Sequence, residues 1–237
     1  MQTTEIAPGL LVRGISPPLR LSDFKLIAFD MDSTLINMEC VDEIADLVGR
    51  KAEVAAITEA AMQGEMGDYK QSLRQRVALL EGVSESDIDA IYQDRLQLNP
   101  GAAELVAACK GAGLKVLLVS GGFTHFSDRL CDRLGIDYSR ANVLEVKDGR
   151  LTGRMLDQAW GDICDGDEKR RMLLQTCAGL GIRSAQTIAV GDGANDLPMM
   201  GAAGLSVAFH AKPAVRALAH VCIDAGGLDR LLTLFED

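Results

Sequence analysis

Four short apolar runs alternate with helical patterns along most of the chain, and this alternation constrains the fold more than any other feature. Each run is continuously apolar, which is typical of a strand buried on both faces of a parallel sheet. Strands that alternate with helices predict a doubly wound α/β core with a parallel sheet. The runs are residues 26–29, 115–122, 187–193 and 205–210.

One long interval breaks the alternation. Residues 37–98 show helical patterns only, so we expect a small helical cap inserted after the first strand. The catalytic core is then formed by residues 25–36 and 99–237. The proline-containing segment 1–24 is interpreted as an irregular N-terminal arm. Within the core, residues 142–154 predict a β-hairpin that turns at an Asp-Gly pair.

Composition excludes several classes of protein. The formal net charge of -10 disfavours binding to nucleic acid, which requires clustered Lys and Arg. The first residues do not resemble a signal peptide, and no apolar run reaches the ~18 residues of a membrane-spanning helix. Six cysteines without C-x-x-C spacing indicate small core residues in a reducing compartment. We therefore expect a soluble, cytoplasmic protein. Nothing in the sequence specifies an oligomeric state.

Polar residues gather where the predicted strands end. Carboxyl ends of parallel strands meet at one edge of the sheet, where ligands bind. Two aspartates separated by one residue would repel each other unless a cation lay between them, and carboxylate oxygens suit Mg²⁺. A serine followed by two glycines before a helix suits a phosphate group. The residues are Asp30, Asp32, Ser120, Gly121, Asp192, Asn195 and Asp196.

These residue types favour one kind of phosphate chemistry. The chain has no Walker A pattern, so it does not resemble a P-loop NTPase. A carboxylate beside a metal can act as a nucleophile, and a second carboxylate can act as general acid and base. The alternative role for a single aspartate is that of a helix N-cap. That role does not account for polar residues that follow several strands in turn.

The motifs D-x-D-S-T, S-G-G, a lone lysine and G-D-G-x-N-D occur in that order at the strand ends. Their order resembles the haloacid dehalogenase superfamily, and the resemblance runs from about Lys25 to the carboxyl terminus. Within that superfamily the chain is similar to the branch that hydrolyses phosphoserine.

The resemblance implies a role for each matching residue. Asp30 would be the nucleophile and a Mg²⁺ ligand, and Asp32 would be the general acid and base. The backbone carbonyl of Asp32, together with Asp192, would complete the metal ligands, and Asp196 would support the metal site. The phosphate and the substrate would be held by Ser120, Gly121, Lys169 and Asn195.

Two residues of the predicted cap would select the substrate. Arg76 lies in an apolar stripe, where pattern alone equally indicates an arginine whose head reaches solvent. Glu39 is predicted in the first turn of a helix capped by Asn37, where pattern alone indicates only a favourable interaction with the helix dipole. In the resembling family the matching residues bind the carboxylate and the ammonium group of an amino acid. Together they imply a phosphorylated amino acid as substrate.

Other readings stay open at this point. Lys169 lies in "DEKRR", and such a run is usually a solvated helix face. Tyr69 stands where the family commonly has Phe, and the segment around Trp160 is longer than usual, so both bear on substrate range. The expected reaction is Mg²⁺-dependent hydrolysis of O-phospho-L-serine. Alternatives are phosphothreonine or another small phosphomonoester as substrate, transfer to an alcohol such as homoserine, and a non-enzymatic sensor of phosphorylated metabolites.

Overall fold

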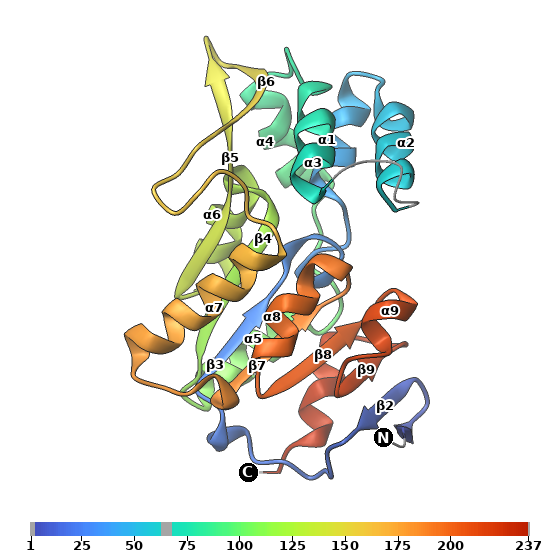
Figure 1. Ribbon diagram of the computed structural model, residues 1–237, viewed down its shortest axis with the longest axis vertical. Helices are drawn as coiled ribbons and strands as arrows, with labels where there is room; N and C mark the ends of the chain where they lie inside the picture. The colour runs from blue at the N-terminus through green and yellow to red at the C-terminus, as the bar shows by residue number, and fades with distance from the viewer. Residues whose placement is uncertain (1–2, 63–67, 237) are drawn as a thin grey trace.

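The computed structural model describes residues 3–62 and 68–236, and its centre is a nine-stranded sheet (Figure 1). The strand order is β1-β2-β9-β8-β7-β3-β4-β5-β6. The strands are β1 (Thr3–Ala7), β2 (Leu10–Arg13), β3 (Leu26–Phe29), β4 (Lys115–Phe123), β5 (Tyr138–Lys147), β6 (Arg150–Leu156), β7 (Thr187–Gly191), β8 (Leu205–Phe209) and β9 (Val221–Ile223).

The strands that carry the predicted site are parallel neighbours. β3 pairs with β4 on one side and with β7 on the other, so Phe29 lies opposite both Leu118 and Val190. The residues that follow Phe29 and Gly191 therefore emerge side by side. All four residues of β3 are buried, as expected for a strand covered on both faces. The predicted parallel α/β core is confirmed.

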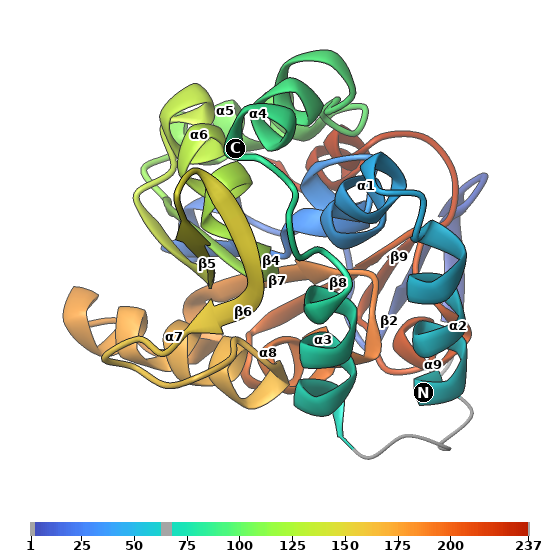
Figure 2. The same cartoon turned by 90° about the horizontal axis from the view of Figure 1, so that it is seen from above.

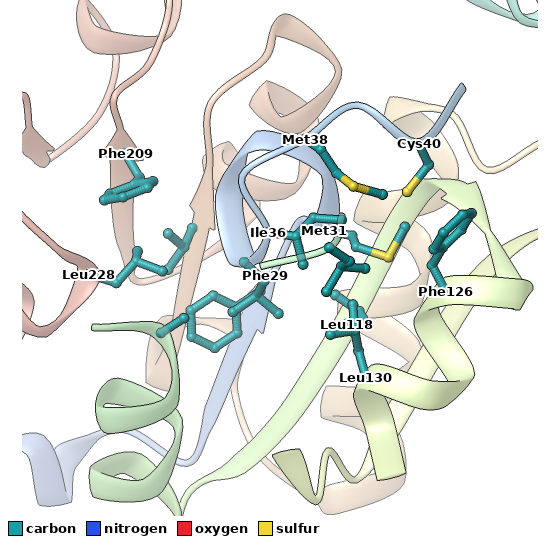
Figure 3. Packing of buried hydrophobic residues seen from close by; sticks show 14 of the residues in the cluster. Phe29, Met31, Ile36, Met38, Cys40, Leu118, Phe126, Leu130, Phe209 and Leu228 are labelled. Atoms are coloured by element: carbon teal, nitrogen blue, oxygen red, sulfur yellow. The ribbon is translucent and has the colours of Figure 1, made fainter. Parts of the chain in front are cut away.

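Helices cover both faces of the sheet (Figure 2). Ile27 and Phe29 pack in the cluster that includes α5 and α6, which Figure 3 shows from Phe29 across to Phe126 and Leu130. Leu26 packs in the cluster that includes α7 and α8 on the other face. The helices are α1 (Cys40–Leu47), α2 (Lys51–Met62), α3 (Tyr69–Ala78), α4 (Glu85–Asp94), α5 (Ala102–Gly111), α6 (Thr124–Leu134), α7 (Gly166–Leu180), α8 (Leu197–Ala202) and α9 (Pro213–Arg216).

Between residues 37 and 98 the structure has the helices α1 to α4, which lie above the ends of β3 and β4 in Figure 1. The two ends of this interval meet: Asn37 N–H donates to Gln97 O at 3.1 Å, and Asn99 N–H donates to Leu35 O at 2.9 Å. The Asn99 side chain also donates to Thr34 O and Ile36 O. This pairing supports the predicted boundaries, and the division into core and cap domains stays a prediction.

The interpretation of residues 1–24 as an irregular arm is wrong for residues 3–13. β1 and β2 form an antiparallel hairpin, and β2 pairs with β9 at the end of the parallel sheet. Leu10 and Val12 are buried while their neighbours are partly exposed, which is the alternation of a strand covered on one face. The hairpin thus covers the edge of β9.

The β5–β6 hairpin was predicted correctly. Lys147 pairs with Arg150 across Asp148 and Gly149, whose φ angles are 52° and 73°. Two consecutive positive φ angles are typical of the tight turn that an Asp-Gly pair favours. No helix in the described ranges is long and apolar enough to cross a membrane.

Candidate active site

The structure brings the predicted site residues together around one cavity of about 850 Å³ between the strand ends and helices α1 and α3. Lys169 is fully buried and lies behind Asp30 instead of at the cavity surface. The predicted residues that line the cavity are Asp30, Asp32, Glu39, Arg76, Ser120, Gly121, Asp192 and Asn195.

The backbone after β3 makes one wide helical turn, Met31–Leu35, in which Ser33 has a φ of 56°. Asp30 Oδ1 accepts a hydrogen bond from the Met31 N–H at 2.7 Å. Thr34 Oγ donates to Asp192 Oδ1 at 3.3 Å and so connects this turn to the end of β7. The turn holds Asp30 and Asp32 at the carboxyl-terminal edge of the parallel strands.

Asp30, Asp192 and Asp196 form an acidic cluster whose carboxylate oxygens lie within 4.8 Å of one another. Burial, followed by the charge of Asp196, raises the pKa of Asp192 to about 7. Burial, followed by the charge of Asp196, also raises the pKa of Asp30 well above its usual range, although Lys169 opposes this rise. These carboxylates favour a proton or a cation, and this donor set could bind a hard divalent metal.

Lys169 is the counter-charge of this cluster. Asp165 caps α7 by accepting the Glu168 N–H at 2.9 Å, and Lys169 follows in the first turn of that helix. Its ammonium lies 2.8 Å from Asp30 Oδ2 and 2.7 Å from Asp196 Oδ1. Burial alone favours a neutral amine, but Asp196 and Asp30 hold the pKa of Lys169 well above its usual range. The alternative of a solvated lysine is therefore wrong.

Asp32 is held by a residue that the sequence indicated only as a core cysteine. The Cys40 N–H donates to Asp32 Oδ2 at 3.1 Å, and the Cys40 thiol donates to Asp32 Oδ1 at 3.0 Å. Burial, followed by the charge of Glu39, raises the pKa of Asp32 to about 7, while the bonds from Cys40 lower it. A carboxyl with a pKa near 7 can both give and take a proton at neutral pH.

The S-G-G segment lies against Tyr69 of α3. The Gly122 N–H donates to Ser120 Oγ at 2.8 Å, and Ser120 is fully buried. A Cβ on Gly121 would overlap the Tyr69 hydroxyl oxygen and would lie 3.2 Å from Tyr69 Cζ. Glycine at position 121 is therefore required by the hydroxyl of this particular aromatic residue.

Gly121→Ala is expected to lower kcat/KM by about 10- to 100-fold, since overpacking costs about 1–3 kcal/mol. Adding Tyr69→Phe should restore much of the loss, because the nearest remaining ring atom, at 3.2 Å, then has to shift by only a few tenths of an ångström. Steady-state kinetics of both single variants and the double variant measure this, with Tyr69→Phe alone as the control. A double variant no better than Gly121→Ala would contradict the steric account.

Glu39 and Arg76 face the same cavity from outside the sheet. Helix α1 begins at Cys40, so Glu39 precedes the helix, and its Oε1 accepts from Ser33 Oγ at 2.7 Å. Arg76 Nε is buried and has no hydrogen-bond partner among the described residues. A buried donor without a partner is costly, and a ligand anion would satisfy it.

The sequence did not indicate two of the residues that organise the site. Cys40 gives no signal, because a thiol in an apolar pattern looks like any core residue. Asn142 donates to Gly121 O at 2.8 Å and accepts from the Cys164 N–H at 2.8 Å. Its only signal was its place between Ala141 and Val143, since an amide that is buried among apolar residues requires hydrogen-bond partners.

Comparisons with known proteins agree with this geometry. The chain is 76% identical over 236 residues to the phosphoserine phosphatase of Albidiferax ferrireducens, with all of both chains covered. A haloacid dehalogenase family hydrolase from Salmonella enterica serovar Typhi superposes with a TM-score of 0.84 at 39% identity, over 93% of this chain and 73% of that one. A phospho-aspartyl intermediate analogue of phosphoserine phosphatase superposes with a TM-score of 0.82 at 40% identity, over 90% and 99% of the two chains.

The family comparison covers most of the core and the whole of every motif described above. Residues 27–201 match the family described as haloacid dehalogenase-like hydrolase, a range that includes the acidic cluster, the S-G-G segment and Lys169. The relative from Albidiferax ferrireducens covers the remainder. On these grounds the chain belongs to the haloacid dehalogenase-like hydrolases.

Proposed function

We propose that the protein hydrolyses O-phospho-L-serine to L-serine and phosphate through an aspartyl phosphate, with Mg²⁺ as cofactor. The observation that carries the proposal is that one cavity joins the Asp30 carboxylate to the buried Nε of Arg76, which has no hydrogen-bond partner in residues 3–62 and 68–236. A substrate that spans this cavity would present a phosphate group at one end and a carboxylate at the other. The relatives named phosphoserine phosphatase support the same assignment.

The first step transfers the phosphoryl group to the enzyme. An oxygen of Asp30 forms a bond to phosphorus, and the bond from phosphorus to the serine oxygen breaks. Asp32, protonated near neutral pH, gives its proton to the departing oxygen so that serine leaves as an alcohol. Lys169, whose ammonium lies 2.8 Å from Asp30 Oδ2, lowers the pKa of Asp30 and so favours the ionised form that attacks.

The second step releases phosphate. Asp32, now ionised, takes a proton from a water molecule whose oxygen attacks phosphorus. The bond from phosphorus to Asp30 breaks, phosphate leaves, and both aspartates return to their starting states. Ser120 and Gly121 would hold the phosphate oxygens through both steps, and Asn195 would contact the substrate from the loop after β7.

The acidic cluster fits the proposed metal. Asp30 and Asp192, with the backbone carbonyl of Asp32, would hold Mg²⁺, and Asp196 would support them from its place beside Lys169. When bound, Mg²⁺ supplies positive charge that offsets the carboxylates and the substrate phosphate. We also propose a cytoplasmic setting, which the six free cysteines support.

A panel of phosphomonoesters tests the function. Phosphoserine should give the highest kcat/KM, above phosphothreonine, sugar phosphates and nucleotides, and the reaction should require Mg²⁺. Activity on a sugar phosphate or nucleotide that exceeds activity on phosphoserine would refute the substrate assignment. Adding homoserine and measuring phosphorylated product distinguishes hydrolysis from phosphoryl transfer.

Arg76→Met is expected to raise the KM for phosphoserine by about 10- to 100-fold, since a charge-assisted hydrogen bond to a carboxylate contributes about 1.5–3 kcal/mol. The KM for p-nitrophenyl phosphate should not change, because that substrate has no carboxylate. Arg74→Met, an exposed arginine on the same helix, is the matched control. An equal rise in KM for both substrates would place Arg76 outside substrate selection.

Mg²⁺ is expected to raise Tm more at about pH 8 than at about pH 5. Asp32 and Asp192 have folded-state pKa values of about 7, above the unfolded value. A raised carboxyl pKa means that the folded protein binds more protons, so its stability without metal falls as pH rises from about 4 to about 7. At the higher pH the carboxylates are ionised and a cation stabilises them most.

Thermal unfolding with and without Mg²⁺ at the two pH values measures this effect. Asp192→Asn should lose most of the Mg²⁺-dependent rise, whereas Asp167→Asn, an exposed residue on α7, should keep it. An unchanged rise in Asp192→Asn would show that the cation binds elsewhere.

A further inference from the structure

Asn142 is a buried amide to which the proposed reaction assigns no part. It lies in β5 and is 1% exposed. Its Nδ2 donates to Gly121 O and its Oδ1 accepts from the Cys164 N–H, each at 2.8 Å. Because one partner is a carbonyl and the other an N–H, the orientation of the amide is determined by its surroundings.

The bond to Gly121 replaces backbone pairing that the sheet lacks at this point. β4 and β5 pair regularly up to Val119 and again at Phe123, with a shift in register between them. The interrupted stretch contains Ser120 and Gly121, the residues proposed to hold phosphate. The side chain of Asn142, opposite Phe123, supplies a hydrogen bond inside this gap.

That bond also determines how Ser120 presents its hydroxyl group. Gly121 O and the Gly122 N–H belong to one planar peptide unit, so fixing the carbonyl fixes the N–H. The Gly122 N–H donates to Ser120 Oγ at 2.8 Å. Accepting this bond uses a lone pair of the oxygen and leaves the hydroxyl hydrogen to donate toward a phosphate oxygen, since no acceptor for it is found among residues 3–62 and 68–236.

The other half of the amide reaches the segment that positions Lys169. Cys164 directly precedes Asp165, the N-cap of α7, and Lys169 lies in the first turn of that helix. Asn142 therefore connects the S-G-G segment to the start of the helix that carries Lys169. The S-G-G segment contributes the groups proposed to hold phosphate, α7 contributes the counter-charge of Asp30, and a single buried side chain bonds to both segments.

We propose that Asn142 is a positioning residue for the phosphate group, which orients the peptide unit of Gly121 and Gly122 relative to α7. The inference rests on the proposed function only in that the site binds a phosphate group. It does not depend on which alcohol that phosphate is attached to. Its consequence is selective: loss of Asn142 should weaken binding of phosphate and leave binding of the amino-acid part unchanged.

Product inhibition of p-nitrophenyl phosphate hydrolysis tests this selectivity, with inorganic phosphate and L-serine as separate inhibitors. Asn142→Leu and Asn142→Ala both remove the two hydrogen bonds. The alanine variant is included in case the protein with the larger leucine does not fold. We expect the Ki of inorganic phosphate to rise about 10-fold and kcat to fall about 100-fold, the scale of a displacement of about 1 Å. The Ki of L-serine should stay unchanged.

Thr187→Val is the matched control, because it removes a buried hydrogen bond, to Ser184 O, at the opposite end of the sheet. It should leave both inhibition constants unchanged. An unchanged Ki for phosphate in either folded Asn142 variant overturns the inference, as does a parallel loss of affinity for phosphate and serine. If L-serine does not inhibit the unmodified protein, the amino-acid substrate is wrong, and the phosphate measurements still decide the role of Asn142.

Discussion

Asp30→Asn is expected to lower kcat by at least about 10⁴-fold while the protein remains folded. An amide oxygen does not attack phosphorus, so no aspartyl phosphate can form. The substitution keeps the size of the side chain and an oxygen that can accept the Met31 N–H. It removes a buried carboxylate whose pKa is raised mainly by burial, and it takes one of two carboxylate partners from Lys169, which keeps its ion pair with Asp196. The free energy of unfolding should therefore fall by less than it does when Lys169 itself is removed.

The measurement combines kcat with thermal unfolding and with mass spectrometry of acid-quenched enzyme. The unmodified protein should gain the mass of one phosphoryl group during turnover, and Asp30→Asn should not. Asp167→Asn makes the same chemical change on the exposed side of α7 and should retain full activity. If Asp30→Asn remains fully active, Asp30 is not the nucleophile and the proposed mechanism is wrong.

The central strands and the position of the site could be predicted because both follow from local pattern. An apolar run such as residues 26–29 is too short for a typical helix and favours a strand covered on both faces, and parallel strands bring their ends together. The aspartates after β3 and β7 therefore had to meet. The N-terminal hairpin could not be predicted in the same way, because the burial of Leu10 and Val12 depends on β9, roughly two hundred residues away.

The detailed surroundings of each charge also lay beyond the sequence. In "DEKRR" three cationic residues are consecutive, and only the packing of α7 shows that Lys169 turns inward while Arg170 is exposed. The two bonds from Cys40 to Asp32 depend on the wide turn after β3, whose left-handed residue Ser33 has no distinctive sequence signal. The sequence predicted which residues form the site. The structure adds the hydrogen bonds and ion pairs that hold each of them in place.

Lys169→Met is expected to lower the free energy of unfolding by about 3–5 kcal/mol, the cost of leaving buried carboxylates without their partner. Methionine matches much of the lysine stem but carries no charge, so Asp30 and Asp196 would face each other unpaired. Removing Lys169 also removes the charge that lowers the pKa of Asp30. At neutral pH Asp30 would then be protonated more of the time, and kcat should fall by at least about 100-fold.

Urea unfolding and steady-state kinetics of two further variants separate stability from catalysis. Arg170→Met removes the same charge from the next, exposed position and should change stability by less than about 0.5 kcal/mol. Lys169→Met combined with Asp196→Asn should recover part of the lost stability, because one of the unpaired carboxylates is neutralised. It should not recover kcat, since Asp30 still lacks its counter-charge. Recovery of both together would mean that Lys169 serves stability alone, and recovery of neither would mean that its ion pair with Asp196 is not what stabilises the fold.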